Sequence, residues 1–182
     1  MKTTLALLFA LLLAPTAFAT CSYSPRGYVG FYYDHIANGG PVTDDYDCWT
    51  PTNATFTTNS VCGSTIKSYQ FGYAGSISQT VNVPSNMTGT YFTIAYELQF
   101  EDPHNDGTNN ELQVSVYDLT TYTQRASDYY DGSMADVSCS PRSVAFNGTN
   151  LAGHTLIVTF SGSTGYSDTI IRVRFISLWQ HS

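Results

Sequence analysis

The sequence predicts an all-β chain folded as an antiparallel β-sandwich of the jelly-roll type. Three observations lead to this prediction. From about residue 76 onward, apolar and polar residues alternate with a period of two, which is typical of strands that bury one face. Clusters of Pro, Asn, Asp and Gly separate the alternating runs. No window carries a sustained apolar stripe of helical period, so no amphipathic helix is expected.

Six alternating runs define the expected strands. They lie at 77–83, 91–100, 112–116, 144–146, 155–160 and 171–175. In the second run, for example, Phe92, Ile94 and Tyr96 alternate with Thr93 and Ala95. Thr, Tyr, Val and Ile fill these runs, as a half-buried pleated surface prefers.

The composition excludes several other classes of protein. The chain has 182 residues, of which 12% are charged and 14% are aromatic, whereas about 25% charged residues are usual. Disordered chains are rich in charge and poor in aromatic residues, so disorder is excluded. Two Lys and three Glu are too few for a coiled coil. The net charge of −7 excludes nucleic acid as the expected partner, because Lys and Arg bind the phosphate backbone.

The amino terminus has the features of a secretory signal peptide. A short positive start precedes an apolar run at 5–14, and Ala17-Phe18-Ala19 matches a small-x-small cleavage site. The apolar run is too short to span about 30 Å of hydrocarbon. We therefore expect residues 1–19 to be removed. Residues 20–182 (182 − 19 = 163 residues) are expected to form one secreted domain, extracellular or at the cell surface, without membrane insertion.

Export permits disulfide bonds, and the expected mature chain has four cysteines. They are too widely spaced for a zinc site, which needs close Cys pairs. Four cysteines allow three pairings. We predict Cys21–Cys48, which would pin an irregular first segment holding a strand near Ile36 and a long loop. We also predict Cys62–Cys139, because strands distant in sequence are neighbours in sandwiches.

Several short motifs carry a family resemblance. They are Ile36-Ala37-Asn38-Gly39-Gly40, Trp49, Ser68-Tyr69-Gln70-Phe71, Ser76-Ile77-Ser78-Gln79-Thr80-Val81 and the run 171–178. Together they resemble secreted jelly-roll domains of the galactose-binding-like type, which include many carbohydrate-binding modules. The resemblance implies a jelly-roll fold with Trp49 packed in the core. Gln79, which lies among apolar strand positions, is expected to bond to backbone groups.

A polar loop matches part of a calcium-binding loop. Asp102, His104 and Asp106 fall at alternating positions, and the carboxylates of Asp102, Asp106 and Glu111 are ligands of the kind that calcium prefers. His104 stands where such loops carry Asp or Asn, so a plain hairpin turn is the alternative. A structural calcium ion, here or at the acidic cluster 44–47, is the only cofactor that the sequence suggests.

Tyrosines in predicted loops are the candidates for a sugar-binding platform. Sugar C–H faces stack on aromatic rings, while carboxylates and amides bind the hydroxyls. The candidates combine a loop Tyr with a neighbouring Asp: Tyr129, Tyr130, Asp128, Asp131, Tyr166 and Asp168. The alternative is that some of the 14 Tyr are ordinary strand residues.

The sequence therefore predicts a secreted, non-catalytic module that binds carbohydrate. A Gly-x-Ser-x-Gly motif is missing, and the four His are scattered. Glu97 and Glu101 lie on one strand about 13 Å apart, whereas the paired carboxylates of a glycosidase lie about 5–10 Å apart. The alternative is a structural subunit of an extracellular surface layer, filament or adhesin that packs against copies of itself.

Overall fold

The computed structural model describes residue 25 and residues 27–29, 32–39, 48–58, 67–87, 89–104 and 110–181. Within this part of the chain the structure is built of ten strands and contains no helix. The strands are β1 (Gly27–Val29), β2 (Tyr32–Asp34), β3 (Thr50–Thr58), β4 (Lys67–Asn82), β5 (Tyr91–Glu101), β6 (Glu111–Asp118), β7 (Thr123–Asp131), β8 (Val137–Asn147), β9 (Thr155–Ser163) and β10 (Ile170–His181).

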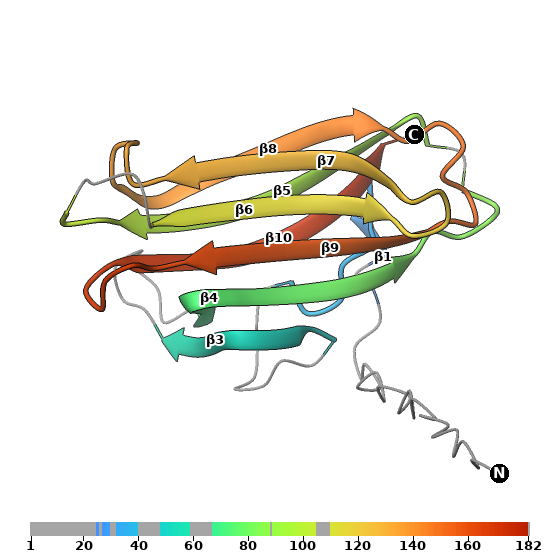
Figure 1. Ribbon diagram of the computed structural model, residues 1–182. Helices are drawn as coiled ribbons and strands as arrows, with labels where there is room; N and C mark the ends of the chain where they lie inside the picture. Colours follow the sequence, from blue (N-terminus) through green and yellow to red (C-terminus); the bar gives the residue numbers. More distant parts are fainter. Residues whose placement is uncertain are drawn as a thin grey trace, which may run out of the picture.

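The strands form two packed antiparallel layers. The front layer has the order β3-β4-β9-β6-β7, and the back layer has the order β8-β5-β10-β2-β1. Figure 1 shows the front layer with β5 and β10 behind it. The long strand β4 joins the layers, because its first half also pairs with β10. Strands that follow one another in the chain mostly change layer, as in a jelly roll. The predicted antiparallel β-sandwich is confirmed.

The period-two alternation explains the core between the layers. Leu112, Val114 and Val116 of β6 are buried, as are Phe92 and Ile94 of β5. Burial of each such side chain stabilises the folded state by about 1.5–3 kcal/mol compared with leaving the side chain exposed.

The motif around residues 36–40 and Trp49 is explained by contacts within the sandwich. Trp49 is 2% exposed, as predicted, and its indole N–H donates to the carbonyl of Asn38 at 3.1 Å. Gln79 holds Ala37 by both ends of its amide, at 2.7 and 2.9 Å, which confirms the predicted backbone bonding. A Cβ at Gly39 would lie 1.7 Å from the carbonyl oxygen of Ile176, so only glycine permits this close approach.

The sequence prediction failed at two front-layer strands and at the first strand. β3 and β7 lack apolar alternation, and residues 128–131 were expected to form a loop. β7 turns Asp128 inward, where Arg142 neutralises it, so a polar residue stands at a core-facing position. The first strands are β1 and β2, and Ile36 lies just after them as a buried core residue.

Some predictions fall outside the described residues. These are the signal peptide at 1–19, Cys21, Cys62, Asp106 and the acidic cluster at 44–47. Neither of the two described cysteines, Cys48 and Cys139, has a free thiol. The two proposed pairings stay predictions. The described residues include no helix long and apolar enough to cross a membrane.

Candidate functional site

Tyr129 is the centre of an exposed polar surface on the front layer. The strand alternation of β7 turns Tyr130 toward the core and Tyr129 outward, where its side chain is 43% exposed. The phenol of Tyr129 donates a hydrogen bond to Oε2 of Glu111 on β6 at 3.0 Å. Asp131 lies directly across from Glu111, so both carboxylates stand beside the tyrosine.

The surface around Tyr129 is rich in hydroxyl and amide groups. Gln113 of β6 and Ser161 of β9 lie in register with Tyr129 and face outward with it. The next outward-facing row has a similar composition and consists of Ser127, Ser115 and Thr159. Such a face offers many neutral donors and acceptors.

Tyr129 and Asp131 do not change their protonation states near neutral pH. Burial, and then the hydrogen bond to Glu111 and the charge of Asp131, raise the pKa of Tyr129 to about 12. Hydrogen bonds from the side chain and backbone of Ser133 hold the pKa of Asp131 below its usual range. Tyr129 therefore stays a neutral phenol, and Asp131 stays an ionised acceptor.

A second exposed tyrosine, Tyr166, lies in the loop after β9. Its ring stacks on the imidazole of His104 with the ring centroids 3.9 Å apart, and Tyr166 is 40% exposed. Nε2 of His104 lies 3.0 Å from Oδ1 of Asp168, and this hydrogen bond lowers the pKa of the Asp168 carboxyl. The amide of Gly165 donates to Oδ1 of Asn110 at 2.7 Å. Asn110 directly precedes Glu111, so both tyrosine groups lie at the same end of the sandwich.

Two of the predicted platform residues are not part of this surface. Tyr130 is 6% exposed, and its phenol donates to the carbonyl of Ala135. Its predicted exposure is wrong, because successive residues of a strand face opposite sides. Asp128 accepts hydrogen bonds from Arg142 and from the phenol of Tyr96, both at 2.7 Å. Burial raises the pKa of Asp128, but the bonds from Arg142 and Tyr96 outweigh it and lower the pKa.

Of the three predicted calcium ligands, Asp106 lies outside the described residues, and Asp102 and Glu111 have different surroundings. Glu111 faces outward and bonds to Tyr129, whereas Asp102 is fully buried. Oδ1 of Asp102 accepts a hydrogen bond from the backbone amide of His104 at 3.1 Å, and its Oδ2 has no hydrogen-bond partner among the described residues. The described residues contain no group of three or more His, Cys, Asp or Glu that would hold a metal ion. Calcium binding stays a prediction that rests on Asp102.

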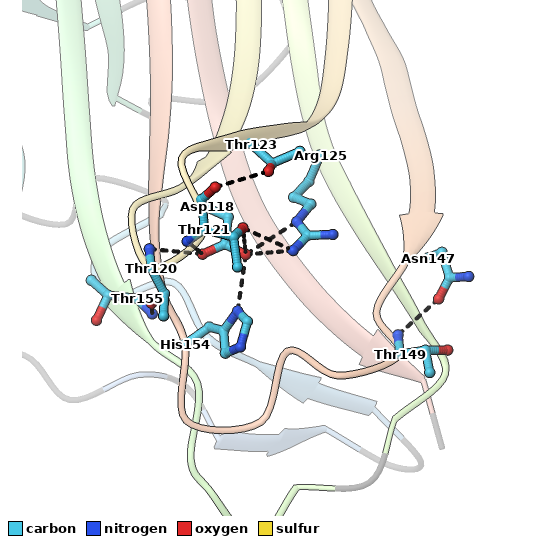
Figure 2. A network of polar contacts seen from close by, with 9 residues as sticks. All are labelled: Asp118, Thr120, Thr121, Thr123, Arg125, Asn147, Thr149, His154 and Thr155. Atoms are coloured by element: carbon cyan, nitrogen blue, oxygen red, sulfur yellow. Dashed lines mark hydrogen bonds and ion pairs between the residues drawn. The ribbon is translucent and has the colours of Figure 1, made fainter.

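Sequence reasoning missed a buried ion cluster at the opposite end of the front layer. Figure 2 shows Asp118 at the end of β6, surrounded by Thr121, Arg125 and His154. Its Oδ2 accepts hydrogen bonds from Arg125 Nη2 at 2.6 Å and from His154 Nδ1 at 2.9 Å. Burial disfavours the charge of Asp118, but these bonds outweigh it and hold the pKa far below its usual range. The cluster ties the β6–β7 turn to the loop before β9.

The signal for this cluster is weak in the sequence. Asp118, Arg125 and His154 are up to 36 residues apart and match no ligand spacing. Only the register of β6, β7 and β9 brings them together. The cluster fixes loops rather than exposing a reactive group, since the carboxylate of Asp118 is fully buried.

No protein-family model matches the sequence, and no curated protein matches it significantly. One similar solved structure is the enzymatically active domain of bacteriophage CBA120 tailspike protein 4, with a TM-score of 0.50 and 13% identity over 81% of this chain and 21% of that one. An arabinose-bound GH51 α-L-arabinofuranosidase, MgGH51, is similar with a TM-score of 0.51 and 15% identity, over 83% of this chain and 27% of that one. The mannan-recognising carbohydrate-binding module TmCBM27 has a TM-score of 0.47 and 11% identity, over 84% of this chain and 100% of that one.

The chain thus spans less than a third of the first two proteins. Several of the similar structures are carbohydrate-binding modules. They do not confirm the galactose-binding-like resemblance. At these identities the likeness shows the fold alone, and that fold is a β-sandwich.

Proposed function

We propose that this chain is a secreted, non-catalytic module that binds carbohydrate on its front layer. One observation carries the proposal. Two exposed tyrosines, Tyr129 and Tyr166, lie at the same end of the sandwich, and each has a carboxylate within its immediate surroundings.

The chemistry of this surface suits a neutral sugar chain. The tyrosine rings offer flat faces to sugar C–H groups, and Glu111, Asp131 and Asp168 accept hydrogen bonds from hydroxyls. The neighbouring Ser, Thr and Gln side chains supply further neutral donors. Because a neutral ligand has no charge to screen, its affinity is expected to change little with salt.

A glycan array tests the proposal directly. The wild-type protein is expected to bind a subset of neutral glycans, and the double variant Tyr129→Ala, Tyr166→Ala is expected to lose that binding. The matched control is Tyr122→Asn, which removes a tyrosine that is 79% exposed at the other end of the front layer. Asn tolerates the positive φ of 54° at this position. Binding that survives the double variant, or a wild-type protein that binds no glycan, would refute the proposal.

The export part of the proposal is supported by the sequence of residues 1–19. The apolar run and the Ala17-Phe18-Ala19 site are the features that a signal peptidase uses. Mass spectrometry of the protein purified from its natural source is expected to find Thr20 as the first residue. A chain that retains Met1 would contradict export by this route.

A specific observation favours self-association as a second candidate function. The back layer exposes Tyr32, Trp179 and Tyr91 on its outer face, and the rings of Tyr32 and Trp179 lie 6.0 Å apart. Exposed aromatic patches often mark interaction surfaces. Analytical ultracentrifugation distinguishes the two functions: a concentration-dependent assembly that Trp179→Ala abolishes supports a structural subunit, whereas a monomer at all concentrations rejects it.

A further inference from the structure

A small cavity opens at the end of the sandwich farthest from Tyr129. It lies between the loop that joins β4 to β5 and the loop that joins β8 to β9, and its volume is about 320 Å³. Val83, Met87 and Phe92 form its apolar part, and Thr90, Thr149 and Gln180 provide its polar groups. This volume falls in the range of small-molecule sites.

Gln180 places an unused hydrogen-bond donor in the wall of this cavity. Its side chain is 5% exposed, and Oε1 lies 2.9 Å from Nε2 of the buried His35. With His35 donating, the amide nitrogen of Gln180 faces away from this bond. Within the described residues, that nitrogen has no hydrogen-bond partner. This nitrogen is not fully enclosed by protein atoms, so water reaches it in the open cavity, and a ligand oxygen can take the place of that water.

Two glycines keep the cavity open. A Cβ at Gly89 would lie 2.4 Å from Nε2 of Gln180, and a Cβ at Gly148 would lie 2.3 Å from the Phe92 ring. A side chain at Gly89 would therefore cover the Gln180 donor, and a side chain at Gly148 would displace the Phe92 ring. The amide of Gly148 also donates to the carbonyl of Thr90 at 2.9 Å, which holds the two loops together. The cavity is thus formed before a ligand arrives, which lowers the entropic cost of binding.

The lining selects the chemical class of the ligand. The cavity is lined by no Asp, Glu, Lys or Arg from the described chain, so a charged ligand would lose its hydration without gaining a counter-ion. A pure hydrocarbon would leave the Gln180 amide unpaired. A molecule with apolar C–H surface and neutral hydroxyls satisfies both parts of the lining. We propose that this cavity binds one neutral sugar unit, with Nε2 of Gln180 donating to a sugar oxygen.

This inference rests on the proposed function, because it takes the ligand to be carbohydrate, but it concerns a second site. Titrations of ¹⁵N-labelled protein with glucose, galactose, mannose, xylose and arabinose test it on the wild type. One of these sugars is expected to shift the amide signals of Gly89 and Gly148 and the side-chain amide of Gln180. The signals of Glu111 and Tyr129 report the front-layer site in the same spectra.

Two alanine-to-phenylalanine variants, which add the same side-chain volume, test where the sugar binds. Ala152→Phe fills the cavity from its exposed rim and is expected to abolish the shifts at Gly148. Ala145→Phe, an exposed position on β8 away from the cavity, is expected to leave them unchanged. Cavity signals that move for none of the five sugars, or binding that survives Ala152→Phe, would overturn the inference. If glycan binding that depends on Tyr129 persists in that case, the proposed function stands without the second site.

Discussion

The phenol of Tyr129 and the carboxylate of Glu111 join two neighbouring strands by a hydrogen bond of 3.0 Å. Burial and this bond raise the pKa of Tyr129 to about 12, compared with about 10 for a free tyrosine. Glu111→Gln is expected to lower the pKa of Tyr129 because the neutral amide no longer favours the protonated phenol. A tyrosinate absorbance titration, with Tyr129→Phe to identify the signal, measures this. An unchanged pKa would show that Glu111 does not act on the phenol.

The neighbouring tyrosines are expected to differ sharply in their effect on stability. Tyr130→Ala removes a buried ring that packs against Phe100 and lies under Arg142, so the free energy of unfolding should fall by about 3–5 kcal/mol. Tyr129→Ala removes an exposed ring and should change it by about 0.5 kcal/mol or less. Urea unfolding of both variants measures the difference. Equal losses would contradict the placement of the two rings on opposite faces of β7.

Much of the fold follows from alternation alone. The expected strands around 91–100 and 112–116 were found because both bury one apolar face against the other layer. β7 was missed because it lies at an edge of the front layer, where one of its core-facing positions holds Asp128 instead of an apolar residue. A period-two pattern cannot reveal a strand whose inward polar residue is neutralised by a residue from another strand.

The candidate site could be predicted in composition but only partly in geometry. Tyr129 and Tyr166 were singled out correctly as exposed rings. The role of Glu111 beside Tyr129 depends on the register of β6 against β7, which the sequence does not specify. The same holds for Asp118 and His154, which lie 36 positions apart in the sequence.

The two-ended contact between Gln79 and Ala37 predicts a costly substitution. Gln79→Leu keeps the size of the side chain but leaves the backbone N–H and C=O of Ala37 buried without partners. The free energy of unfolding should fall by about 2–4 kcal/mol. Gln113→Leu, on the outward face of β6, is the matched control and should cost much less. Similar losses for both variants in chemical denaturation would argue against the bonding seen at Ala37.

Calcium binding is tested most sharply at Asp102. Its fully buried carboxylate has one oxygen without a hydrogen-bond partner in the part of the chain that the structure describes, and a cation would satisfy this oxygen. Saturating calcium is expected to raise the melting temperature relative to chelator, corresponding to about 2.7 kcal/mol at 100 times the dissociation constant. Asp102→Asn should remove this shift, and Glu111→Gln should leave it intact because Glu111 faces Tyr129. Identical melting curves with calcium and chelator would exclude a structural calcium ion.

The buried carboxylate of Asp118 is expected to make stability fall in acid. Its pKa is lowered in the folded protein, so its contribution is fully present above the unfolded value of about 3.9 and is lost as the pH falls toward the folded pKa. Asp118→Asn breaks the bonds to Arg125 and His154 and should lower the free energy of unfolding by about 3 kcal/mol near neutral pH. The difference in free energy of unfolding between variant and wild type should narrow below about pH 4, where the ionised carboxylate of the wild type begins to lose its stabilising effect. Asp168→Asn, in an exposed pair with His104, is the control and should cost less than about 1 kcal/mol. Urea titrations across this pH range measure both, and a gap that stays constant down to pH values well below 4 would show that the charge of Asp118 does not stabilise the fold.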